Sequence, residues 1–232
     1  MGTLILISAN AEWQAIRDLY PLAKPGKTPY GEWFDVSLPR APEPVIFFQG
    51  GWGKIAAAAS TQYAVDRWKP ELVINLGTCG GMEGKVSEGQ VILAERTLVY
   101  DIIEQMSDPD EAIAHYTTQV DLSWLGDELP AGVQRALLVS ADRDLVAAEL
   151  PMLAERYDAV AGDWESGAIA WVCARNGARC LILRGVSDVV SASGDVAYGN
   201  YAHFVESTQA VMRKLVESLP GWIIKSKRGI QA

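Results

Sequence analysis

The sequence predicts an α/β fold, built as one three-layer α/β/α domain around a central mixed β-sheet. Short apolar runs of strand length alternate with helical patterns along the 232 residues. A chain of this length can bury one sizeable core, and it contains no repeat, linker or low-complexity segment. Hydrophobic residues make up 49% and charged residues 21%, which is typical of globular proteins. We therefore expect a single domain over residues 1–232.

In the first half of the chain the pattern predicts mostly strands. These strands are expected at residues 4–8, 33–38, 45–49, 72–76 and 90–94. The second and third of them are expected to form a hairpin, because a proline-rich connection separates them. An alanine-rich helix is predicted to begin after the glycines at 50–53 and to end at Trp68. Residues 104–130 are polar and are expected to be irregular.

In the second half, strands and helices alternate more regularly. Strands are expected at residues 136–140, 159–162 and 180–186, and helices at 145–156, 165–176 and 202–219. Gly177 is a typical residue just past a helix end, so it is expected to stop the second of these helices. Pro220 and Gly221 are expected to end the last one and to leave a solvated tail over about 221–232.

Composition argues against several classes of partner. The net charge is −9 and no basic patch is present, so we expect no nucleic-acid partner. No apolar run reaches about 18 residues, so no membrane contact is expected. The first residues lack a basic segment and a cleavage signal, which favours a cytoplasmic protein. Three cysteines without metal or redox spacing, and only two histidines, predict no metal and no cofactor.

Residues with chemical potential follow the predicted strands. Glu12, the glycine-rich stretch 77–81, Asp142, Glu165 and Asp188 each come just after a strand. Ligands of open α/β sheets bind at the carboxyl ends of strands, so we expect a site there.

Each of these residues also has an ordinary structural interpretation. The stretch 77–81 could present N–H groups to a ligand or form a tight turn, and it lacks the dinucleotide-binding spacing. Glu12 and Glu165 could be helix-start charges. Arg184 is harder to dismiss, because it lies within an apolar run where a charge needs a partner. Asp188 could pair with Arg184 or cap a turn.

Four stretches together resemble a known family. They are residues 7–12 (ISANAE), 75–81 (NLGTCGG), 163–168 (DWESGA) and 184–188 (RGVSD). In order and spacing they look like the signatures of the purine nucleoside phosphorylase/uridine phosphorylase superfamily, over about residues 1–219. Within it the chain is most similar to the methylthioadenosine/S-adenosylhomocysteine nucleosidases.

The resemblance implies cleavage of the N-glycosidic bond of a purine nucleoside. Asp188, aided by Ser187, would act as the acid near N7 of the departing base, and such general acid help contributes about 10²–10⁴-fold. Glu12 would orient and deprotonate the attacking water. Glu165 would accept hydrogen bonds from ribose hydroxyls and favour a cationic sugar. The remaining residues implied at the substrate are Thr78, Gly80, Asp144, Leu145, Trp164, Arg184 as an ordering residue, and Tyr198.

Water rather than phosphate is the expected nucleophile. Phosphorolytic relatives carry an arginine where this chain has Asn75, and Arg17 is the only arginine near the first strand. A phosphate dianion without an arginine clamp is poorly held. A phosphate-dependent phosphorylase and a non-catalytic nucleoside-binding protein are the alternatives. The presence of three acids, Glu12, Glu165 and Asp188, argues against a protein that only binds nucleosides.

Two departures from the family pattern concern the substrate. Trp164 replaces a methionine that packs against the sugar, and Asp144 replaces a phenylalanine that stacks on adenine. A carboxylate there could instead accept from N–H groups of another purine, and Trp52 in the glycine-rich turn is also unusual. The expected substrates are 5′-methylthioadenosine, S-adenosylhomocysteine or a related 5′-modified nucleoside, with futalosine-type and simple purine nucleosides as alternatives. The resemblance also implies a homodimer.

Overall fold

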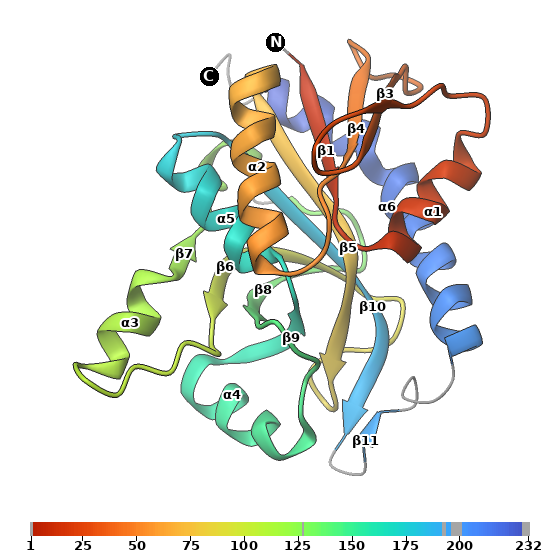
Figure 1. The fold of residues 1–232 in the computed structure, drawn as a ribbon. Coiled ribbons are helices and arrows are strands. Elements are labelled where there is room, and N and C mark those ends of the chain that lie inside the picture. The colour runs from red at the N-terminus through yellow and green to blue at the C-terminus, as the bar shows by residue number, and fades with distance from the viewer. Residues whose placement is uncertain (1, 127, 192–193, 196–200, 229–232) are drawn as a thin grey trace.

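A computed structural model describes residues 2–126, 128–191, 194–195 and 201–228. Its strands form a mixed sheet with helices on both sides (Figure 1), so the predicted α/β class is confirmed. The strands are β1 (Thr3–Ile7), β2 (Gly26–Lys27), β3 (Glu32–Val36), β4 (Val45–Gln49), β5 (Leu72–Met82), β6 (Val91–Val99), β7 (Thr117–Gln119), β8 (Val133–Ser140), β9 (Ala159–Asp163), β10 (Cys180–Ser191) and β11 (Gly194–Asp195). The helices are α1 (Asn10–Leu19), α2 (Lys54–Trp68), α3 (Pro109–His115), α4 (Leu150–Tyr157), α5 (Ser166–Arg175) and α6 (Tyr201–Arg228).

Strand β5 is the centre of the sheet. It pairs in parallel with β1 and with β10, and its carboxyl end pairs antiparallel with β9. Strand β10 continues to β6, β6 to β8 and β8 to β9, so the strands β5, β10, β6, β8 and β9 close a ring. On the other side of β1 the sheet continues through β4 to the predicted hairpin partner β3. Parallel strands covered on both faces are continuously apolar, which is why residues 4–7 are all buried aliphatics.

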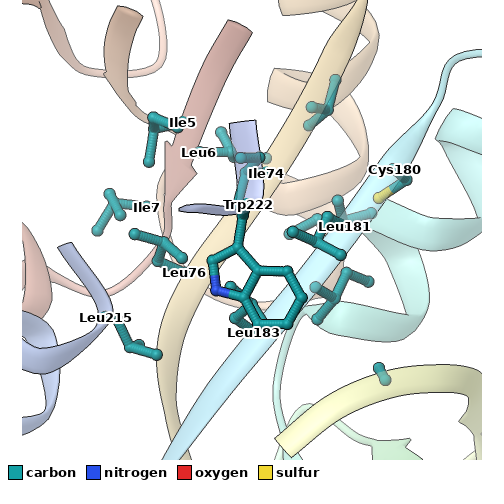
Figure 2. Packing of buried hydrophobic residues seen from close by; sticks show 14 of the residues in the cluster. Ile5, Leu6, Ile7, Ile74, Leu76, Cys180, Leu181, Leu183, Leu215 and Trp222 are labelled. Atoms are coloured by element: carbon teal, nitrogen blue, oxygen red, sulfur yellow. The ribbon is translucent and has the colours of Figure 1, made fainter. Parts of the chain in front are cut away.

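The helices cover the sheet in two pairs. Helix α2 packs against α5 on one side, and α1 packs against α6 on the other (Figure 1). Figure 2 shows Trp222 of α6 among aliphatic side chains of β1, β5 and β10. No helix in the described ranges is long and apolar enough to cross a bilayer.

The expected end of the last helix is wrong. Helix α6 continues through Pro220 to Arg228, and Trp222 is only 1% exposed. Burial of this indole, and a hydrogen bond from Lys225 Nζ to the carbonyl of Glu128 at 2.7 Å, outweigh the cost of a proline within the helix. Trp222, Ile223 and Ser226 are buried, so this part of α6 packs on the core and is not a solvated tail, while residues 229–232 fall outside the described part of the chain.

Other strands and helices also differ from the boundaries expected from the sequence. Strands β5 and β10 run past residues 76 and 186, so the stretch 77–81 is strand and not a turn. The segment 104–130 contains α3 and β7. The helix expected from residue 145 begins as α4 at Leu150, after a 3₁₀ turn at Ala147–Glu149.

Candidate active site

A cavity of about 800 Å³ opens at the carboxyl ends of β1, β5, β9 and β10. Segments far apart in the sequence bring most of the predicted site residues into its wall. Those that line it are Glu12, Thr78, Gly80, Asp144, Leu145, Trp164, Glu165, Ser187 and Asp188. Arg184 is not in the wall, because it lies fully buried behind it. Tyr198 falls outside the residues that the structure describes.

Arg184 contacts three carboxyl groups on the acidic side of the cavity, from behind the wall. Its Nε lies 2.8 Å from Asp163 Oδ2, its Nη1 3.7 Å from Glu12 Oε1 and its Nη2 3.6 Å from Glu165 Oε2. Its Nη2 also donates to Asn75 Oδ1 at 2.8 Å. A buried guanidinium is tolerated only with such partners, so the arginine fixes the three carboxylates relative to one another. It does not line the cavity itself.

Gly77 makes room for this arrangement. A Cβ atom at position 77 would lie 1.8 Å from Arg184 Nη1 and 2.7 Å from Glu12 Oε1. No side chain larger than hydrogen fits there, so this glycine of β5 is required by close packing rather than by a turn.

Glu12 is held in place at the start of α1. It is 2% exposed, which excludes the solvated helix-start charge as its interpretation. Its Oε1 accepts from the Thr78 N–H at 2.6 Å and from Thr78 Oγ1 at 3.0 Å, and its Oε2 accepts from the Ala9 N–H at 3.1 Å. The carboxylate therefore links the start of α1 to β5 in the wall of the cavity.

Glu165 directly precedes α5 and carries a perturbed carboxyl group. Burial raises its pKa to about 8, Arg184 opposes that shift, and the like charges of Asp163 and Glu12 add to it. Its Oε1 accepts from the Gly53 N–H at 3.0 Å. Burial thus favours the neutral form of this carboxyl group.

Asp163 completes the acidic cluster, and sequence reasoning did not single it out as a site residue. Its Oδ1 accepts from Ser140 Oγ at 2.7 Å and from the Ser166 N–H at 3.1 Å. These bonds join β8, β9 and the start of α5. The signal was present in the sequence, since Asp163 ends a strand two residues before Glu165.

A β-bulge places Ser187 and Asp188 on the same side of β10. Val186 pairs with Cys79 and Asp188 pairs with Gly80, so Ser187 is the extra residue between two regular pairs. In a regular strand neighbouring side chains point to opposite faces, but both of these line the cavity. Ser187 Oγ lies 2.5 Å from Asp188 Oδ1 and 3.3 Å from the Cys79 carbonyl oxygen. The bulge therefore builds the predicted hydroxyl–acid pair.

Leu145 and Asp188 both lie near Gly80 in the wall of the cavity. A Cβ on Gly80 would lie 3.4 Å from Leu145 Cδ1 and 3.5 Å from Asp188 Oδ2. A Cβ on Gly162 would lie 2.7 Å from Leu145 Cδ2, so this leucine needs the paired glycines of β5 and β9.

Several lining residues were not predicted as site residues. They are Ala9, Asn10, Ala11, Trp52, Cys79, Tyr100, Arg143, Gly162, Asp163, Val190 and Phe204. Arg143 Nη2 donates to both oxygens of Glu149 at 2.8 Å, and its guanidinium lies 5.3 Å from the Tyr100 ring centroid. Trp52 and Asp163 are the two of these residues that gave a signal in the sequence. Within the described ranges no group of His, Cys, Asp and Glu side chains is arranged to hold a metal ion.

The chain is similar in sequence to proteins of known families. The family model of the phosphorylase superfamily matches residues 5–219. A 5′-methylthioadenosine/S-adenosylhomocysteine nucleosidase of Marinomonas sp. (strain MWYL1) is 25% identical over 183 residues, which is 72% of this chain and 78% of that protein. A nucleosidase of the same name from Staphylococcus haemolyticus (strain JCSC1435) is 23% identical over 75% of this chain and 82% of its own length.

Solved structures agree on the fold. The 5′-methylthioadenosine/S-adenosylhomocysteine nucleosidase of Neisseria meningitidis, in complex with methylthio-immucillin-A, is similar with a TM-score of 0.73 at 19% identity, over 97% of this chain and 100% of that chain. Futalosine hydrolase of Helicobacter pylori strain 26695 is similar with a TM-score of 0.75 at 16% identity, over 93% of this chain and 95% of that chain.

Proposed function

This chain belongs to the phosphorylase superfamily, and on that premise we propose that it hydrolyses the N-glycosidic bond of a purine nucleoside to free base and sugar. The observation that carries the proposal is the convergence of Glu12, Glu165 and Asp188 on one cavity. A protein that only bound nucleosides would gain nothing from three carboxyl groups at the sugar and base positions.

Asp188 is assigned to the departing base. As the glycosidic bond lengthens, the base takes the bonding electrons, and a proton or hydrogen bond at N7 stabilises it. Ser187 Oγ, 2.5 Å from Asp188 Oδ1, fixes the orientation of that carboxyl group. Leu145 and Gly80 line the same cavity, and Asp188 would have to carry a proton for this step.

Glu12 and Glu165 are assigned to the water and the sugar. Glu12 lines the cavity and would orient the attacking water and take its proton. Glu165 would accept hydrogen bonds from ribose hydroxyls, and its negative charge would favour the cationic sugar that forms as the base leaves. Arg184 holds both carboxyl groups from behind, which supports its assignment as an ordering residue.

Hydrolysis is favoured over phosphorolysis by the position of Asn75. This side chain is fully buried, donates to the Leu6 carbonyl oxygen at 3.0 Å and accepts from Arg184. It therefore offers nothing to a phosphate. Arg143 is the arginine that lines the described part of the cavity, and Glu149 already neutralises it. A phosphate dianion needs stronger cationic partners than this.

The proposed substrates are 5′-modified purine nucleosides. The names of the relatives put 5′-methylthioadenosine and S-adenosylhomocysteine first, and the futalosine hydrolase structure makes a futalosine-type nucleoside the second candidate. A cavity of about 800 Å³ lies within the range of about 300–1,000 Å³ that is usual for small-molecule sites. We also propose that the protein is cytoplasmic, because its three cysteines are free thiols. We propose a homodimer as well, supported by exposed apolar side chains such as Trp52 and Ile55.

Release of free base in phosphate-free buffer tests this proposal. The panel is 5′-methylthioadenosine, S-adenosylhomocysteine, futalosine, adenosine and inosine, each assayed with and without phosphate. We expect base release without phosphate from at least one 5′-modified nucleoside, and its loss in Asp188→Asn with nucleoside binding retained. Strict dependence on phosphate would replace the nucleosidase by a phosphorylase. Binding without release of base from every nucleoside would refute an enzyme.

A further inference from the structure

The residues that depart from the family pattern meet in one wall of the cavity. Trp52, Asp144 and Trp164, which we call the tryptophan wall, come from three separate segments and all line the cavity. Trp164 stands between Asp163 and Glu165, so the wall adjoins the acidic cluster directly.

Two contacts fix the orientation of the Trp164 indole. Its Nε1–H donates to Asp144 Oδ1 at 3.2 Å. Its ring packs edge-on against Trp52, with the ring centroids 5.6 Å apart and the planes at 60°. A hydrogen bond to a charged acceptor and an edge-on aromatic contact are both directional, so together they hold the plane of the indole.

The supporting segments are themselves tied to the site. The Gly53 N–H donates to Glu165 Oε1 at 3.0 Å, and the Lys54 N–H donates to Asp142 Oδ1 at 2.7 Å. The Lys54 ammonium group forms ion pairs with Asp101 and Asp142. Trp52 and Asp144 therefore keep their places relative to Glu165.

We propose that the indole of Trp164 is the flat surface on which the purine base of the substrate stacks, and that Asp144 is a positioning residue that holds this indole and not a ligand of the base. The inference rests on the proposed function and names a specificity-determining residue of the same cavity. Planar heteroaromatic rings stack well on indole. Tyr100, an aromatic residue that lines the cavity outside the tryptophan wall, already has the Arg143 guanidinium over its ring.

Adenine binding measured by calorimetry tests the wall without requiring turnover. Trp164→Leu removes the stacking surface, and we expect adenine to bind about 5- to 100-fold more weakly. Asp144→Ala frees the indole, and we expect a smaller loss, about 2- to 10-fold, in Kd and in KM for 5′-methylthioadenosine, while kcat stays within about threefold. Asp144→Asn keeps an acceptor for the indole N–H and should restore binding to within about twofold of wild type.

A double-mutant cycle separates positioning from direct contact. Trp164→Phe keeps an aromatic ring but removes the N–H, so Asp144→Ala should add no further loss in that background. Trp124→Phe is the matched control, since it removes an indole N–H bond to the Asp121 carbonyl oxygen at 2.8 Å, away from the cavity. Its adenine affinity should equal that of wild type.

The inference would be overturned if the wild-type protein did not bind adenine, or if Trp164→Leu bound it with unchanged affinity. It would also be overturned if Asp144→Ala lowered the adenine affinity of Trp164→Phe as much as it lowers that of the wild type. A fourth contrary outcome is an Asp144→Asn variant that binds hypoxanthine in preference to adenine. Failure of the proposed function has a different signature, because wild-type protein would then release no base while adenine binding still depended on Trp164.

Discussion

The absence of a side chain at Gly77 allows Arg184 and Glu12 to pack closely against β5. Because a Cβ there would overlap Arg184 Nη1 at 1.8 Å, Gly77→Ala must displace a buried guanidinium from its carboxylates. We expect the free energy of unfolding to fall by about 3–5 kcal/mol in urea denaturation, with loss of base release.

Gly221→Ala is the control, because a Cβ added at this position of α6 would meet no atom within 4 Å outside its own part of the helix. It should be neutral or stabilise by up to about 1 kcal/mol. Equal stability of the two variants would contradict the packing argument.

The carboxyl group of Glu165 predicts a pH dependence. Burial raises its pKa to about 8, so the anion that we propose as the acceptor of ribose hydroxyls is a minor form below that pH. We expect kcat/KM to rise up to tenfold per pH unit from about pH 6 and to level off near pH 8, because kcat/KM reports the free enzyme. Glu165→Gln should remove this rising limb along with most of the activity. A wild-type profile that is flat from pH 6 to pH 8 would show that the group is already ionised.

At the scale of single elements, α6 makes the clearest prediction. Trp222 lies past Pro220 and is buried against β1, β5 and β10 (Figure 2). Trp222→Ala should lower the free energy of unfolding by about 3–5 kcal/mol, and Trp222→Phe by a smaller amount, because part of the volume is kept. Urea denaturation followed by circular dichroism measures both. If Trp222→Ala unfolds at the wild-type midpoint, the last turns of α6 do not stabilise the core.

The predictable elements were those whose signal is local. The strands at residues 4–8, 45–49 and 159–162 are short apolar runs, and each was found within a residue or two. The extension of β5 through residues 77–81 could not be predicted, because glycines are typical of turns and only the distant partners β9 and β10 make them strand.

The same distinction applies to the site. Glu12 and Glu165 follow β1 and β9, and sequence alone predicted that these two side chains and Asp188 meet at one site. Asp188, however, lies within β10, which continues past its expected end. The bulge at Ser187 depends on pairing with β5, and the place of Trp52 depends on a contact between Gly53 and Glu165, 112 residues apart. Such tertiary contacts leave no periodic signal in the sequence.

On the scale of the whole molecule, the proposed homodimer can be tested through exposed apolar residues. Ile55, Ile103 and Met106 are 84%, 79% and 99% exposed. The ion pair between Lys54 and Asp101 brings their two segments together near the cavity. We expect twice the monomer mass in light scattering and a monomer for Ile55→Glu and Ile103→Glu, because a buried unpaired charge weakens an apolar interface. Leu22→Glu is the control, since this 94% exposed leucine lies on a different segment. A wild-type monomer would refute the homodimer.

The ring of strands has a consequence for protein synthesis. Strand β5 joins β10 across contacts such as that between Ser187 and Cys79, 108 residues apart. The ribosome delivers β5 long before β10, and pairings of such long range form slowly. A chain that stalls before Cys180 already carries Glu12 and Thr78, but it lacks Arg184 and exposes an edge of its central strand. Unpaired edges of this kind are templates for aggregation, so we expect such incomplete chains to aggregate more readily than the complete protein.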